Sequence, residues 1–168
     1  PTILIEGATV LPLDDAGRVR EDTDVLVRDG RVAGLGPSGS FVDAPVDKRI
    51  DGAAKCVMPG LVNAHTHSPA AFAKGTVDRD DHPRFMWRNQ ADTVGRTREE
   101  IHACTLLAAL EMLRTGTTAV IDNYPEQPFE EADVEPVVAA YKEAGLRAAI
   151  ALRVYDEPYY DILPRTGA

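Results

Sequence analysis

The chain has 168 residues, of which 44% are hydrophobic and 27% are charged, and its formal net charge is −9. This composition is typical of globular proteins and excludes collagen-like and intrinsically disordered chains. The acidic balance, without a run of Lys or Arg, argues against nucleic-acid binding. No apolar run approaches the roughly 18 residues of a membrane-spanning helix. Two cysteines do not indicate a disulfide framework, so we expect a reducing, cytoplasmic location.

The first 55 residues predict short strands joined by tight turns. Two apolar runs flank Gly7 near the start of the chain. Further along, Asp29-Gly30 separates two more apolar runs, and this dipeptide tolerates the positive φ angles of a type I′ hairpin turn. We therefore expect residues 1–55 to form a small β-domain.

From residue 56 the pattern changes to strands that alternate with helices. An apolar strand is expected at 56–64, followed by a long loop at 68–96 that contains prolines and several charges. Thr97 and Glu100 then match a helix capping box, in which each side chain bonds the other residue's backbone amide. This helix is expected to end at Gly116, because glycine readily adopts the left-handed conformation that closes a helix.

Two further strands and one more helix follow. A β-branched strand is predicted at 117–121, a helix at 134–144 with Asp133 as its cap, and an apolar strand at 146–154. Strands that alternate with helices imply a parallel sheet buried on both faces. The predicted fold class is therefore α/β.

Two histidines, His65 and His67, close the strand expected at 56–64. Alternate residues of a strand point to the same face, so both imidazoles can reach one metal ion. Imidazole suits zinc and iron, and a bound cation lowers the pKa of water enough to supply hydroxide for hydrolysis. Two ligands are too few for a tight catalytic site, so further ligands must come from elsewhere. A buried histidine pair bonded to the backbone is the structural alternative.

Two stretches carry a resemblance to a known family. The sequence VMPGLVNAHTH at 57–67 resembles the first-strand signature of the amidohydrolase superfamily, and AALEMLRTGTT at 108–118 resembles the helix-to-strand passage of its aminohydrolase branch. That branch includes nucleobase and adenosylhomocysteine deaminases and triazine chlorohydrolases. The resemblance implies one divalent metal ion, zinc or alternatively iron, held by His65 and His67 with two later histidines and an aspartate. It also implies an acid/base glutamate on a later strand, outside this chain.

The same resemblance implies a (β/α)8 TIM-type barrel preceded by part of a β-sandwich, with domains at 1–55 and 56–168. Three strands and two full helices are fewer than the eight units of such a barrel. We therefore expect a partial barrel, and a complementary polypeptide that carries the remaining strands. A split enzyme, a cleaved product, an incomplete segment and a self-contained small domain are the alternatives.

Three residues are candidates for substrate binding. Trp87 lies in the loop at 68–96, which the resemblance implies to be a lid over the substrate. Asn123 follows the second strand at the carboxyl-end mouth, where barrels place their chemistry. Arg153 lies near the end of the third strand and can pair with an anionic substrate group. Packing, turn formation and a surface ion pair are the respective alternatives.

The predicted function is hydrolytic deamination of a nitrogen heterocycle by a metal-dependent hydrolase that acts on a small molecule. We expect this chain alone to be inactive and the complete enzyme to be an oligomer. Hydrolysis of a cyclic amide or carbamate is an alternative reaction. A non-catalytic structural subunit with the same fold is an alternative of another class, and a bound metal ion would argue against it.

Overall fold

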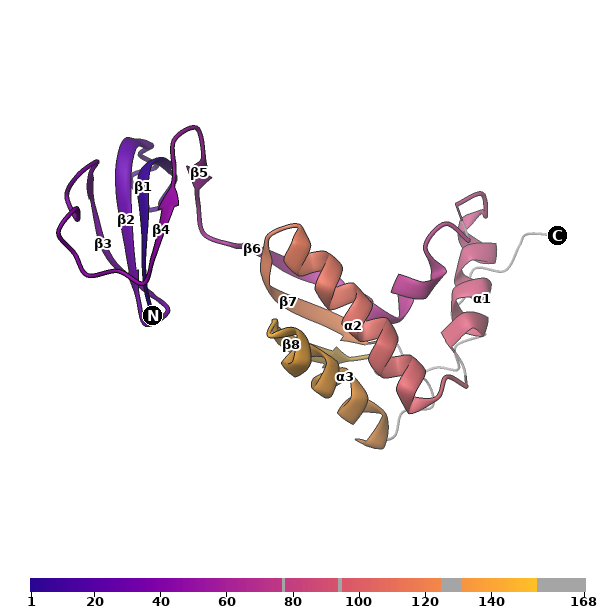
Figure 1. Cartoon of the computed structure of the whole chain (residues 1–168). Coiled ribbons are helices and arrows are strands. Elements are labelled where there is room, and N and C mark those ends of the chain that lie inside the picture. Colours follow the sequence, from indigo (N-terminus) through magenta and orange to yellow (C-terminus); the bar gives the residue numbers. More distant parts are fainter. Residues whose placement is uncertain (77, 94, 125–130, 154–168) are drawn as a thin grey trace. The chain divides into compact units, whose positions relative to one another are not determined.

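The protein is described by a computed structural model that covers residues 1–76, 78–93, 95–124 and 131–153. It contains two compact units, Pro1–Pro59 and Gly60–Ala168, which Figure 1 shows as a β-sheet and as strands packed with helices. Within the described ranges, no helix is both long and apolar enough to cross a membrane. The last residue of the third predicted strand lies outside these ranges.

The first unit is a β-sheet in the order β3-β2-β1-β4, and β5 also pairs with β1. Its strands are β1 (Thr2–Val10), β2 (Arg20–Arg28), β3 (Arg31–Pro37), β4 (Lys48–Asp51) and β5 (Cys56–Val57). Asp29 and Gly30 join β2 and β3 with φ angles of 50° and 74°, which confirms the predicted hairpin. The two apolar runs around Gly7 form one strand rather than two, with an irregular register where Gly7 takes a φ of 66°.

A buried carboxylate organises this first sheet. Asp24 is 1% exposed, and its two oxygens accept hydrogen bonds from the backbone amides of Gly7 (3.0 Å) and Gly39 (2.9 Å). Ala8, Val10 and Val25 form the buried cluster beside it. One carboxylate therefore joins the irregular point of β1 to the turn after β3.

The second unit contains three parallel strands in the order β6-β7-β8 and helices between them. Its elements are β6 (Leu61–Thr66), the 3-10 helix η1 (Ser68–Ala73), α1 (His82–Thr93), α2 (Arg98–Arg114), β7 (Thr117–Tyr124), α3 (Glu131–Ala144) and β8 (Arg147–Leu152). The alternation of strands and helices confirms the predicted α/β class. The Thr97–Glu100 capping box is present, and Gly116 has the expected positive φ of 90°.

Several element boundaries differ from the sequence prediction. The helix expected at 134–144 begins at Glu131, so Asp133 lies within α3 and is not at its cap position. The strand expected at 56–64 is two strands: β5 pairs with β1 in the first unit, and β6 begins after Pro59-Gly60. Proline cannot donate a ladder hydrogen bond, which explains the break. The segment 68–96, expected as a loop, contains the helices η1 and α1.

The helices α2 and α3 lie side by side and cover one face of the second sheet (Figure 1). The core beneath them is formed by buried residues of α2, β7, α3 and the residue before β8. These are Ile101, Ala109, Val120, Tyr124, Val137, Tyr141 and Leu146. Along β7 the buried residues alternate with more exposed ones: Val120 and Asp122 are buried, whereas Ile121 is 40% exposed. Burial on both faces was expected, but among the described residues the second face leaves Val62 and Ile121 exposed.

Candidate metal centre

The two histidines lie together where β6 ends. His65 is the penultimate residue of β6 and His67 follows the strand, and their ring centroids are 4.8 Å apart with the ring planes at 84°. His65 is exposed and His67 is half-buried. As their spacing predicts, the two side chains project together from the carboxyl end of the strand.

An irregularity in β6 accompanies this arrangement. Asn63 pairs with Val120 and Thr66 pairs with Asp122, so β6 uses three steps where β7 uses two. Such an extra residue is a β-bulge, a feature that often re-aims side chains beside functional sites. Asn63 and Thr66 both line a groove beside α2, whereas His65, which lies between them in the sequence, does not.

The Nδ1 atoms of both histidines face Asn123 of β7. Nδ1 of His67 lies 2.5 Å from the Asn123 backbone oxygen, and Nδ1 of His65 lies 2.8 Å from Asn123 Nδ2. A carbonyl oxygen only accepts, so Nδ1 of His67 carries the hydrogen and its Nε2 keeps a free lone pair. Metal-binding histidines donate one ring N–H to an oxygen acceptor and bind the metal ion through the other nitrogen. His67 has this arrangement, and His65 gains it when the Asn123 side-chain amide turns its oxygen, rather than Nδ2, toward Nδ1. The chemistry of these donors therefore fits a divalent cation.

A second buried carboxylate, Asp122, holds the chain immediately after His67. Asp122 is fully buried and accepts hydrogen bonds from the Ser68 backbone amide (3.0 Å) and the Tyr141 hydroxyl (2.9 Å). Burial, and then the negative charge of Asp122, raises the pKa of Tyr141 well above its usual range, so its hydroxyl stays a neutral donor. The Ser68 hydroxyl also meets Thr105 of α2 at 3.2 Å.

Sequence reasoning did not find this buried network. It ended the second strand at residue 121, and so placed Asp122 and Asn123 after it with turn formation as their alternative role, whereas β7 continues to Tyr124. The available signal was the alternation of Val120, Asp122 and Tyr124, which continues the buried face of the strand.

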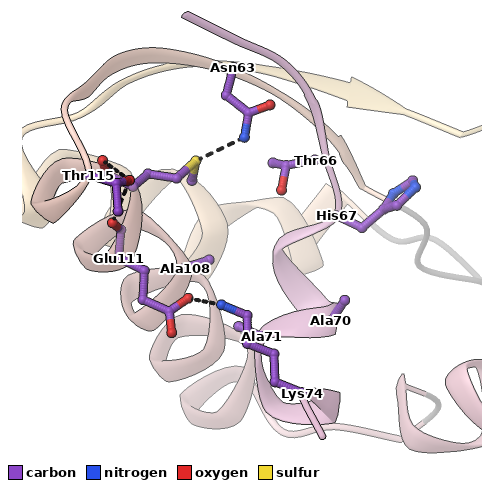
Figure 2. A pocket seen from close by; sticks show the side chains of 10 residues that line it. Asn63, Thr66, His67, Ala70, Ala71, Lys74, Ala108, Glu111 and Thr115 are labelled. Atoms are coloured by element: carbon purple, nitrogen blue, oxygen red, sulfur yellow. Dashed lines mark hydrogen bonds and ion pairs between the residues drawn. The ribbon is translucent and has the colours of Figure 1, made fainter. Parts of the chain in front are cut away.

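A groove of about 470 Å³ lies beside β6 on its helix-covered side (Figure 2). Its walls come from β6, the η1 segment and α2, and an ion pair between Lys74 and Glu111 spans it. Figure 2 shows the ring of His67 pointing away from Glu111 and Thr115. The groove is therefore a feature of the β6–α2 side and not the space that both imidazoles share.

The other two candidate substrate residues lie on separate elements. Trp87 is 50% exposed on α1, which packs against η1. Arg153 directly follows β8, and its backbone amide donates to the Tyr124 oxygen at 3.2 Å. Ala151 pairs with Asn123, so by alternation Arg153 shares the face of the sheet that carries Asn123.

The histidine pair needs additional ligands. In the part of the chain that the structure describes, no group of three or more His, Cys, Asp or Glu side chains is arranged to hold a metal ion. Catalytic zinc sites usually have three protein ligands. Any further ligands would therefore come from residues outside this description.

This chain is similar to deaminases and a chlorohydrolase of known sequence or structure. A 5-methylthioadenosine/S-adenosylhomocysteine deaminase from Pelotomaculum thermopropionicum is 33% identical over 89% of this chain and 33% of its own length. An atrazine chlorohydrolase variant from Arthrobacter aurescens TC1, solved with zinc and atraton, has a TM-score of 0.78 at 25% identity over 89% of this chain and 35% of that one. An adenosine deaminase from Xanthomonas campestris with bound zinc has a TM-score of 0.69 at 32% identity, over 87% and 32% respectively.

This chain spans about a third of the length of the curated relatives that it matches. The sequence model of the amidohydrolase family matches residues 56–160, which include both histidines and the strands around them. The chain therefore belongs to the amidohydrolase family.

Proposed function

We propose that β6, β7 and β8 are the first three strands of a (β/α)8 barrel, and that the first unit is part of a β-sandwich. The strands are parallel and adjacent in chain order, with α2 and α3 together on one face. Val62, Ile121 and Leu152 are exposed apolar residues on these strands, and barrel closure would bury such side chains. A complementary polypeptide segment, carrying the other strands, completes the fold in this proposal.

We further propose that the completed barrel is a metal-dependent hydrolase that deaminates a nitrogen heterocycle, with an adenine nucleoside as the favoured substrate. The observation that carries this proposal is the adjacent pair His65 and His67, with their Nδ1 atoms engaged by Asn123. The relatives named above include deaminases of adenosine derivatives and zinc-bound structures. The deaminase relatives and the zinc-bound structures support the proposal of a zinc-dependent deaminase, with iron as the alternative metal.

Each residue has a defined part in this proposal. His65 and His67 would hold the cation through Nε2, and a cation bound there would make water acidic enough to act as hydroxide near neutral pH. Asp122 and Tyr141 keep the segment after His67 in place. The acid/base group that moves the proton to the leaving amine belongs to a strand outside this chain.

Two further residues are proposed to contact the substrate. Arg153 shares a sheet face with Asn123, so its cation is available to an anionic or strongly polar group of the substrate. Trp87, half-exposed on α1 after the metal-binding strand, is proposed to line a lid over the substrate. Both cysteines are free thiols, which agrees with the cytoplasmic location that we propose for the oligomeric enzyme.

The test compares two histidines in the complete enzyme. His65→Ala should remove about one bound metal ion per chain and abolish ammonia release from 5′-methylthioadenosine and S-adenosylhomocysteine. His102→Ala is the matched control, because His102 lies on α2 and pairs with Glu143 at 3.1 Å, apart from the metal pair. Metal content is measured by elemental analysis and activity by ammonia release.

Two outcomes would contradict the proposal. Full metal retention in His65→Ala would remove the metal role of the pair. Metal binding without ammonia release from any adenine nucleoside would reject an adenine nucleoside as the substrate. Because the structural match to an atrazine chlorohydrolase has a TM-score of 0.78, chloride release from a chlorotriazine is then the second reaction to measure.

A further inference from the structure

Asn123 contacts both histidines, and it does so through two different groups. Its backbone oxygen meets Nδ1 of His67 at 2.5 Å, and its side-chain amide meets Nδ1 of His65 at 2.8 Å. We propose that Asn123 is a positioning residue that engages both imidazoles at Nδ1 and, with its side-chain amide oxygen turned toward His65, reserves both Nε2 atoms for the metal ion. This inference rests on the proposed metal-dependent function, and it replaces the substrate contact that the sequence suggested for Asn123.

The placement of Asn123 follows from the alternation along β7. Asp122 and Tyr124 are buried on the helix-covered side, so Asn123 between them points to the opposite face. The parallel pairing with β6 brings that face of β7 beside the histidines. Asp122 meanwhile accepts the Ser68 backbone amide on the buried side. Two consecutive residues of β7 therefore hold the end of β6 from both faces of the sheet.

The two groups of Asn123 constrain the histidines differently. The backbone oxygen can only accept, and it therefore specifies the hydrogen on Nδ1 of His67 whatever the side chain is. The side-chain amide can present either its NH₂ group or its oxygen to His65, and a half-turn of the amide exchanges them. Only the oxygen accepts from an Nδ1–H and leaves Nε2 of His65 free. We infer that the metal-bound enzyme has the amide oxygen facing His65, whereas Nδ2 faces it here.

Two substitutions separate this role from a purely structural one. In Asn123→Ala the contact to His65 is lost, and we expect zinc affinity to fall about 10- to 100-fold, as for other residues that orient metal-binding histidines. In Asn123→Asp the carboxylate can only accept, so it should restore zinc affinity to within a few-fold of the wild-type value. Ile121→Val, on the same face of β7, is the control and should leave zinc affinity unchanged. Competition with a chromophoric chelator measures the affinity in the complete enzyme.

A second readout does not depend on the metal. In the metal-free enzyme labelled with ¹⁵N-histidine, the ring nitrogens of His65 report which of them carries the hydrogen. Nδ1 should carry it in Asn123→Asp, and this preference should be lost in Asn123→Ala, while His67 stays unchanged in both variants because its partner is the backbone.

The results that would overturn the inference are distinct from those that would reject the proposed function. Wild-type zinc affinity in Asn123→Ala, an Asp variant no better than Ala, or a raised KM with unchanged zinc affinity would each show that Asn123 does not position the pair. If the wild-type enzyme binds no metal ion, the proposed function fails. The ¹⁵N pattern of His65 then still decides whether Asn123 controls its tautomer.

Discussion

Among the described residues, each unit of this chain has one buried aspartate, and the two carboxylates hold different parts of the molecule in place. In the first unit Asp24 accepts two backbone amides, those of Gly7 and Gly39. In the second unit Asp122 accepts one backbone amide, from Ser68, and one side-chain hydroxyl, from Tyr141 of α3. Both aspartates are at most 1% exposed, and both join segments that are distant in sequence.

The difference lies in what each carboxylate holds in place. Asp24 joins an irregular strand to a turn, and its partners Gly7 and Gly39 have no side chains that could bind a ligand. Asp122 holds the residue that directly follows His67, and Asn123 beside it contacts both imidazoles. A buried carboxylate bonded to neutral donors therefore stabilises the sheet in the first unit, and in the second unit it also supports the candidate metal site.

The largest expected effects come from truncating the two carboxylates. Asp122→Ala leaves two buried donors without a partner, at about 1–3 kcal/mol per donor, so it should lower the free energy of unfolding by roughly 2–6 kcal/mol. Asp24→Ala should cost less, because its donor Gly7 is half-buried and its donor Gly39 is exposed and can bond water instead. Only Asp122→Ala should also weaken zinc binding, because only it releases the segment after His67. Calorimetry and chelator competition on the complete enzyme measure the two effects.

An equal loss of zinc affinity in Asp24→Ala and Asp122→Ala would show that zinc binding follows overall stability rather than the position of Ser68. Unchanged zinc affinity in Asp122→Ala would remove Asp122 from the support of the metal site.

Two glycines extend the comparison between the units. A Cβ added at Gly60 would overlap the side chain of Thr118, whereas one added at Gly52 would lie 2.6 Å from the backbone oxygen of Glu6. Both Gly→Ala variants should lose about 1–3 kcal/mol of stability through overpacking. Thr118→Ala should recover part of the loss in Gly60→Ala, because it removes the two nearest atoms and leaves only its Cβ at 2.8 Å, while a backbone oxygen cannot be removed by substitution. Thermal unfolding of the single and double variants checks this difference, and no recovery in the Gly60 pair would refute it.

A smaller effect is expected for the hydroxyl that serves Asp122. Tyr141→Phe should cost about 1.5–3 kcal/mol near neutral pH, the usual range for a hydrogen bond to a charged group. The raised pKa of Tyr141 means that its contribution is fully present below about pH 10, its ordinary pKa, and decreases as the pH rises further. The wild-type protein should therefore lose stability above pH 10 more steeply than the Phe variant.

Burial also raises the pKa of the Cys104 thiol, which weakens the folded protein at high pH as well. Both proteins share this contribution, so it cancels in the difference between them. Parallel pH profiles for the wild-type protein and Tyr141→Phe, measured by chemical denaturation, would contradict the proposed state of Tyr141.

The smallest expected effect is at the start of α2. Thr97→Ala removes the capping box, in which Thr97 and Glu100 bond each other's backbone amides, and should cost about 1 kcal/mol. The cap hydrogen bonds lower the pKa of Glu100, so their contribution should be lost as the pH falls below its ordinary value of 4.5. Zinc affinity should not change, which makes Thr97→Ala a stability control for Asp122→Ala. Chemical denaturation of the wild-type protein and Thr97→Ala at about pH 4 and about pH 7 tests this contribution. An equal loss of stability at the two pH values would contradict a contribution from ionised Glu100.

The sequence by itself determined the features that depend on neighbouring residues. Alternation along a strand placed His65 and His67 on the same side, the Thr97–Glu100 spacing predicted the start of α2, and Asp29-Gly30 predicted the hairpin. Each of these follows from local geometry and hydrogen bonding within a few residues. The family assignment also came from contiguous stretches, and the comparisons support it.

Only the tertiary structure decided which partners surround the histidines. The pairing of β5 with β1, the bulge in β6 and the continuation of β7 to Tyr124 all depend on strand pairing across distant parts of the chain. Asp-Asn favours a turn locally, but burial of Asp122 against Ser68 and Tyr141 outweighs that preference. Asn123 reaches both imidazoles because of the register in which β6 and β7 pair, and that register is decided by burial and pairing across the sheet, not by one strand alone.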